Sequence, residues 1–99
     1  MRDFKITNTE GGAALIIILT TGAKQNKVVS KDDEVVHIDL TTAGDDVEID
    51  RQLVRFLATK LGIHRERIAT TSSKKKNKRM VIVMGMTPEE IQHYLFAQV

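Results

Sequence analysis

The chain of 99 residues contains no cysteine. This absence excludes disulfide bonds, a thiolate nucleophile and cysteine ligands for a metal ion. A protein without disulfides is typical of a reducing compartment, so we expect a cytoplasmic protein.

Long apolar runs are also missing. The longest, AALIIIL at residues 13–19, has seven residues, whereas a membrane-spanning helix needs about 20. It follows Asp3 and Glu10 and therefore lacks the layout of a secretory signal peptide. Its β-branched residues favour a buried strand. We expect no membrane association.

Aromatic residues make up 4% of the chain: Phe4, Phe56, Tyr94 and Phe96. Proteins that bind single-stranded nucleic acid stack the bases on such side chains. Because the helical pattern described below places Phe56 in the core, the sequence argues against a base-stacking platform.

The composition is that of one soluble globular domain spanning residues 1–99, with 41% hydrophobic and 28% charged residues. The net charge is only +2, but the charges are segregated. Eight of the thirteen acidic residues lie between residues 32 and 50: Asp32, Asp33, Glu34, Asp39, Asp45, Asp46, Glu48 and Asp50. Residues 65–79 contain seven bases and one acid, Glu66. This asymmetry indicates two surfaces of opposite charge.

Residues 46–61 are predicted to form the central helix. Large apolar residues recur at the spacing of one helical face: Ile49, Leu53, Phe56, Leu57 and Leu61. We expect Asp46 to be the N-cap and Gly62 to adopt the left-handed conformation after the last turn. Glu48, Asp50 and Lys60 have the charges that the helix dipole favours.

A second helix is predicted from Thr87, with Pro88 at the first helical position and Glu90 completing a capping box. Its expected inner face comprises Ile91, Tyr94, Leu95 and Val99. Apolar patterns predict strands at residues 3–7, 14–20, 34–40, 67–71 and 79–84.

The first two strands are expected to form a hairpin. Val28 and Val29 form a weaker strand candidate before an expected turn at residues 30–33. The predicted order is β-β-β-α-β-β-α, a two-layer α+β domain with both helices on one face of a mixed or largely antiparallel sheet.

Residues 19–26, LTTGAKQN, resemble the strand and PGAK-type loop of the YggU-like proteins, a small family of unknown function. The resemblance continues in the family's order over about residues 13–95. It implies a two-layer fold with a mixed four-stranded sheet. The family's G-K-A-N motif falls on residues 47–50, where none of its four residues is present. Its S-G-x-x-S-R-x-K turn falls on residues 72–79, where Ser72 and the final positive charge remain. The chain thus resembles a divergent member.

The basic turn at residues 74–79, preceded by four hydroxyl residues, is the main candidate site. Lysine, arginine and hydroxyl groups suit phosphate oxygens, which dominate affinity for nucleic acid. The candidate residues are Arg65, Arg67, Ser72, Ser73, Lys74, Lys75, Lys76, Lys78 and Arg79. The alternative is a solvated hairpin loop that keeps a sheet edge from pairing with other chains.

Other chemistry finds less support in the sequence. The acids at residues 45–50 lack the spacing of a calcium loop and suit the start of a helix. The three histidines, His37, His64 and His93, have no metal-ligand spacing. The serines lack a glycine-framed nucleophile elbow, and the glycines do not form a phosphate-cradling loop. We therefore expect no catalytic residues, no cofactor and no metal.

Two function classes follow. The first is a non-catalytic module that binds RNA, DNA or a ribonucleoprotein through the basic turn. The second is a protein-interaction module that uses a sheet face or the acidic face at residues 32–50. A small enzyme with an unfamiliar site is a third reading, which a pocket between the helix start and the basic turn would favour.

Overall fold

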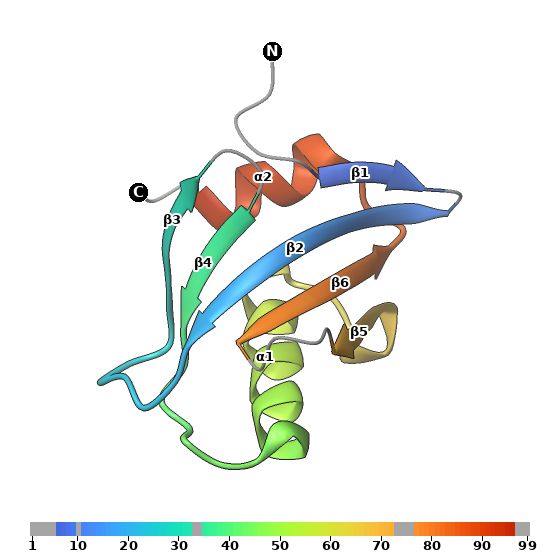
Figure 1. The fold of residues 1–99 in the computed structure, drawn as a ribbon. Coiled ribbons are helices and arrows are strands. Elements are labelled where there is room, and N and C mark those ends of the chain that lie inside the picture. Colours follow the sequence, from blue (N-terminus) through green and yellow to red (C-terminus); the bar gives the residue numbers. More distant parts are fainter. Residues whose placement is uncertain (1–5, 10, 33–34, 73–76, 97–99) are drawn as a thin grey trace.

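The computed structural model describes the chain except for residues 1–5, 10, 33–34, 73–76 and 97–99 (Figure 1). Its elements are β1 (Ile6–Thr9), β2 (Gly12–Thr20), β3 (Lys27–Asp32), β4 (Val35–Asp39), α1 (Asp46–Leu61), the short 3₁₀ helix η1 (Arg65–Arg67), β5 (Ile68–Ser72), β6 (Lys78–Met84) and α2 (Pro88–Phe96).

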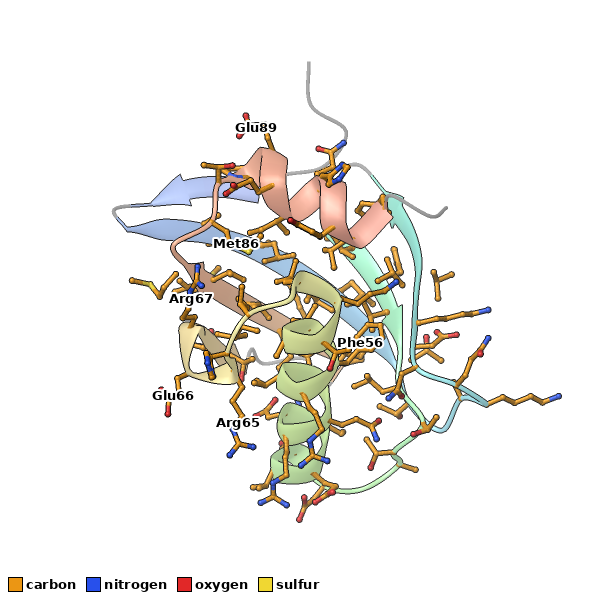
Figure 2. The ribbon with its side chains drawn as sticks, turned by 180° about the vertical axis from the view of Figure 1, so that it is seen from behind. Phe56, Arg65, Glu66, Arg67, Met86 and Glu89 are labelled. Atoms are coloured by element: carbon orange, nitrogen blue, oxygen red, sulfur yellow. The ribbon has the colours of Figure 1, made fainter. Side chains whose placement is uncertain are left out.

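The strands form one mixed sheet in the order β3-β4-β2-β6-β5, with β1 pairing to β2. One edge of β2 pairs first with β1 and then, from Ile16 onward, with β4; its other edge pairs with β6. The β2–β4 pair is parallel, whereas the other described pairs are antiparallel. Both helices lie on the same face of the sheet (Figures 1 and 2). The predicted two-layer α+β fold is therefore confirmed.

The number of strands before the central helix was underestimated. Four strands precede α1 because β3 extends from Lys27 through most of the expected turn to Asp32. This strand lies at the sheet edge and pairs only with β4, with a bulge between Val28 and Ser30. An edge strand needs one paired side and little apolar content, so its sequence is mostly polar. The sheet is correspondingly larger than the four strands that the family resemblance implies.

The N-cap of α1 lies one residue earlier than expected. The N-cap is Asp45, whose Oδ1 accepts the Glu48 N–H at 3.0 Å. Asp46 is the first helical residue instead. The predicted end is confirmed: Gly62 has φ 70° and donates its N–H to the Ala58 carbonyl at 2.9 Å.

Helix α2 has the predicted capping box. Thr87 Oγ1 accepts the Glu90 N–H at 3.1 Å, and Glu90 Oε1 accepts the Thr87 N–H at 3.0 Å. Ile91 and Leu95 are buried, but Tyr94 is 49% exposed and packs edge-on against His93. The prediction for Tyr94 was wrong because the four-residue step from Ile91 to Leu95 defines the inner face. Val99 lies outside the described residues.

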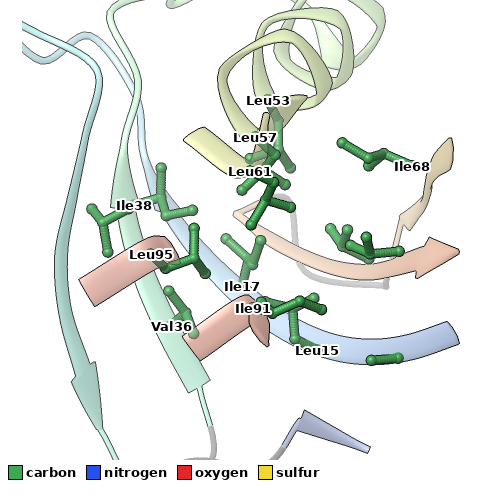
Figure 3. Packing of buried hydrophobic residues seen from close by; sticks show 14 of the residues in the cluster. Leu15, Ile17, Val36, Ile38, Leu53, Leu57, Leu61, Ile68, Ile91 and Leu95 are labelled. Atoms are coloured by element: carbon green, nitrogen blue, oxygen red, sulfur yellow. The ribbon is translucent and has the colours of Figure 1, made fainter. Parts of the chain in front are cut away.

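The core lies between the sheet and the two helices (Figure 3). Alternate residues of β2 and β4 meet three leucines of α1 and two apolar residues of α2: Leu15, Ile17, Val36, Ile38, Leu53, Leu57, Leu61, Ile91 and Leu95. Side chains alternate across a strand, so the intervening residues of β2 and β6 face away from both helices. Within the described residues, neither helix is long and apolar enough to cross a membrane.

Candidate nucleic-acid interface

The basic turn connects β5 to β6. These strands pair antiparallel from Ile68↔Val83 to Ser72↔Arg79, and residues 73–77 link them. Ser73, Lys74, Lys75 and Lys76 lie outside the described residues. Ser72 ends β5, and Lys78 begins β6 as a half-buried residue opposite Ile18 of β2.

Arg79 lies in the interior, on the helix-covered face of the sheet. Its side chain is 1% exposed. Nε donates to Asp50 Oδ1 at 2.6 Å, Nη2 donates to Asp46 Oδ1 at 3.1 Å, and Nη1 donates to the Lys78 carbonyl at 3.0 Å. We therefore remove Arg79 from the candidate phosphate contacts. The reason is strand alternation: Arg79 shares its face with the buried residues Val81 and Val83, while Lys78 and Met80 have the opposite orientation.

The Arg79 contacts hold the base of the hairpin against the start of α1. Asp46 and Asp50 come from the first turns of the helix and converge on one guanidinium from β6. The hairpin base is also joined to β2, because the Leu19 N–H donates to the Asn77 carbonyl at 2.7 Å. Charge-assisted hydrogen bonds are the stronger class of side-chain hydrogen bond. The segment that carries the lysines is therefore flanked by residues whose positions these hydrogen bonds fix. We call Asp46, Asp50, Asn77 and Arg79 together the hairpin base.

A cavity of about 340 Å³ lies beside the hairpin base. It joins the start of α1 to the hairpin base and is lined by Thr21, Gly44, Asp45, Asp46, Ile49 and Asn77. Asp45 caps the helix and Asp46 binds Arg79, so both carboxylates already have structural partners. Among the described residues, the lining contains no histidine or serine, and no cluster of three metal-ligating residues occurs. The pocket that would favour an enzyme exists, with two acids, a hydroxyl and an amide as its polar side chains.

Arg65 and Arg67 differ in their surroundings. Arg65 is exposed, whereas Arg67 is half-buried and donates Nε–H to the Met84 carbonyl at 3.0 Å. The Arg67 guanidinium packs against Gly85, whose φ of 79° favours glycine at this position. Figure 2 shows the two side chains leaving η1 in different directions. Arg65 is thus available to a ligand, and Arg67 fastens η1 to the end of β6.

Two arginines of α1 extend the basic surface beyond the sequence-based set. Arg51 and Arg55 are exposed and four residues apart, so they share one face of the helix. Arg51 contacts Glu48 at 3.1 Å, a solvent-exposed pair that contributes little to stability. The short helix η1, which carries Arg65, is in contact with α1. The spacing of Arg51 and Arg55 is evident from the sequence. The contact between their helix and the segment that carries Arg65 is seen only in the structure.

No model of a known protein family matches the chain, and no curated protein is significantly similar to it in sequence.

Proposed function

We propose that this chain is a non-catalytic, cytoplasmic module that binds the phosphate backbone of RNA, DNA or a ribonucleoprotein. The contacts would come from Ser72, Ser73 and the lysines of the β5–β6 link, together with Arg65. The observation that carries the proposal is the anchored base of this link. The paired strands and the Arg79 ion pairs fix where the lysine run leaves the fold. A preorganised base lowers the entropy lost on binding.

The local charge balance supports this proposal. Near the hairpin base, Asp45, Asp46 and Asp50 carry three negative charges and Arg79 carries one positive charge, so two net negative charges remain. The link and the first residue of β6 contain four lysines: Lys74, Lys75, Lys76 and Lys78. Burying Arg79 between the two acids therefore leaves the lysines in excess. Arg51, Arg55 and Arg65 add positive charge on the α1 side.

The expected ligand is a duplex or a folded nucleic acid, recognised through its backbone. Aromatic side chains for base stacking are scarce, and Tyr94 of α2 is the exposed large aromatic residue among those described. Contacts with four phosphates would give a slope of log affinity against log salt of about −3.6 on duplex DNA. The affinity would then fall roughly a hundredfold between 50 and 200 mM salt.

Fluorescence anisotropy with labelled single- and double-stranded RNA and DNA tests the proposal. The hairpin variant replaces Lys74, Lys75, Lys76 and Lys78 with glutamine. The matched control replaces four other lysines, Lys24, Lys27, Lys31 and Lys60, and so changes the net charge by the same amount. We expect binding that weakens with salt, disappears in the hairpin variant and persists in the control. Absence of binding at low salt, or equal loss in both variants, would disprove the proposal.

We also propose that the chain is a divergent YggU-like protein. Two motif positions that had seemed unrelated in sequence support this view. Asp50 stands at the last position of the G-K-A-N motif and Arg79 at the last position of the S-G-x-x-S-R-x-K turn, and their side chains are 2.6 Å apart. The two motif positions are thus in direct contact in this chain, as they would be if both motifs belonged to one site.

A further inference from the structure

The chain has four methionines and neither cysteine nor tryptophan. Cysteine thiolates and methionine thioethers are the side chains that peroxides commonly oxidise. Because this chain has no thiol, its thioethers are the groups on which such an oxidant acts. The structure describes three of them: Met80 and Met84 in β6, and Met86 in the segment that leads from β6 to α2. Met1 lies outside the described residues.

The three described methionines differ in exposure. Met80 and Met84 are 45% and 44% exposed, whereas Met86 is 8% exposed and belongs to the core. Met80 and Met84 are four residues apart on one strand, so both side chains lie on the face of the sheet opposite the helices. No helix of the described chain covers this face, which points toward the viewer in Figure 1. A small oxidant in water therefore reaches two of the three thioethers.

The strand register leaves few atoms beside Met84. Its partner in β2 is Gly12, which has no side chain, and β5 pairs with β6 only as far as Val83. The methyl carbon of Met84 lies 3.3 Å from the position that a Cβ on Gly11 would occupy. A larger residue in this turn would cover part of the thioether, whereas the two glycines leave it accessible.

Met80 has larger neighbours, but its thioether also lies on the solvent side of β6. It pairs with Ile16 of β2 and with the exposed Thr71 of β5. Arg79 and Val81, the residues on either side of it in β6, point to the helices and are fully buried. An oxygen atom added to the Met80 sulfur thus enters the solvent and leaves the core unchanged.

We propose that Met80 and Met84 are modification sites, which hydrogen peroxide oxidises to methionine sulfoxide while Met86 stays reduced. The sulfur lone pair attacks one peroxide oxygen and the O–O bond breaks, so the thioether gains that oxygen and the peroxide is reduced to water. Each sulfoxide converts a flexible apolar side chain into a polar one. The two reactions therefore make one face of the sheet more polar without opening the core. Because a sulfoxide is uncharged, this modification is independent of the proposed phosphate contacts.

Timed oxidation of the folded protein by hydrogen peroxide, followed by tryptic digestion and tandem mass spectrometry, tests the proposal. Arg79 is the last lysine or arginine of the chain, so all three methionines lie in one tryptic peptide, residues 80–99. We expect Met80 and Met84 to be oxidised at least about fivefold faster than Met86, which is the ratio of their exposed fractions. The protein should keep its native circular dichroism spectrum after these two oxidations.

The same reaction in guanidinium chloride is the control. Unfolding exposes all three thioethers, so their rates should agree within about twofold. The double variant Met80→Leu, Met84→Leu should keep Met86 reduced during the time in which the native protein oxidises both exposed methionines. Equal rates in the folded protein, or the same preference in the denaturant, would overturn the proposal. Rapid oxidation of Met86 in the double variant would also overturn it, because neighbouring methionines rather than burial would then be what protects Met86.

Discussion

Strand β6 carries a charged residue on the face that the helices cover and an apolar residue next to it on the face that they leave uncovered. On β6, the helix-covered face holds the fully buried Arg79, and the uncovered face holds the half-exposed Met80. The guanidinium is tolerated inside because Asp50 and Asp46 satisfy it, since a buried charge must be paired. Met80 has no comparable cover from either helix of its own chain. The adjacent residues Arg79 and Met80 thus differ in how far the elements of the described chain cover them.

Two neighbouring isoleucines of β2 measure the difference between the faces most directly. Ile17 is fully buried under the helices, while Ile16 lies on the face of the sheet opposite the helices and is half-buried. We expect Ile17→Ala to lower the free energy of unfolding by about 4 kcal/mol, because it removes buried methyl groups and leaves a cavity. The identical change at Ile16 should cost about 1 kcal/mol. Urea unfolding would measure both values, and equal costs would show that the open face is covered within the chain.

Removing the buried charge should have the next largest effect. Arg79→Ala leaves Asp50 without its nearest partner and empties a buried site, so we expect a loss of about 3 kcal/mol in unfolding free energy. Arg51→Ala, which removes the exposed pair with Glu48, is the control and should change stability by less than about 0.5 kcal/mol. If the two variants were equally stable in urea, the Arg79 ion pairs would have no structural role.

The family positions allow a finer test of the same contact. Asp50→Asn and Arg79→Lys each place the YggU-like residue at one motif position. We expect each single change to destabilise the fold, and the double variant to be more stable than the sum of the two losses by about 1 kcal/mol. A double-mutant cycle in urea would measure this coupling. Strict additivity would show that the side chains at the two motif positions do not interact energetically in this chain.

The smallest effect on stability is expected for Met80, on the face of the sheet opposite the helices. Met80→Gln exchanges a half-exposed thioether for an amide of similar length, and stability should change by less than about 0.5 kcal/mol. The measurement is the midpoint of thermal unfolding, with Met86→Gln at the 8% exposed Met86 as the comparison. Met86→Gln should lower the midpoint clearly because it buries an amide. A similar fall for Met80→Gln would mean that Met80 is covered in the folded monomer.

Local patterns in the sequence were sufficient for the helices and most of the strands. The spacing of apolar residues and Gly62 defined α1, and the capping box defined α2. The N-cap was misplaced because Asp45 and Asp46 both suit the position, and the choice is made by Arg79, which lies 33 residues further on and engages Asp46. β3 was largely missed because an edge strand carries little apolar signal.

The candidate site was less predictable than the fold. Arg79 belongs to a run of basic residues in the sequence, and only strand alternation through Val81 and Val83 separates it from the lysines. Arg67 was predicted as a surface base, but its bond to the Met84 carbonyl requires the approach of η1 to the end of β6. The surroundings of both arginines depend on contacts between distant segments, which a local charge pattern does not contain.

The pairing of β2 with β6 has a consequence for the newly made chain. Ile16 reaches its partner Met80 only after 64 more residues have been synthesised, since 80 − 16 = 64. At about 5–20 residues per second, the ribosome takes on the order of 3–13 s to add them. During that time the IIIL segment of β2 has only the locally formed β1, β3 and β4 as possible partners. An apolar strand that lacks one of its partner strands for this long is prone to aggregate. We therefore expect the yield of folded protein to depend on chaperones that bind the nascent chain.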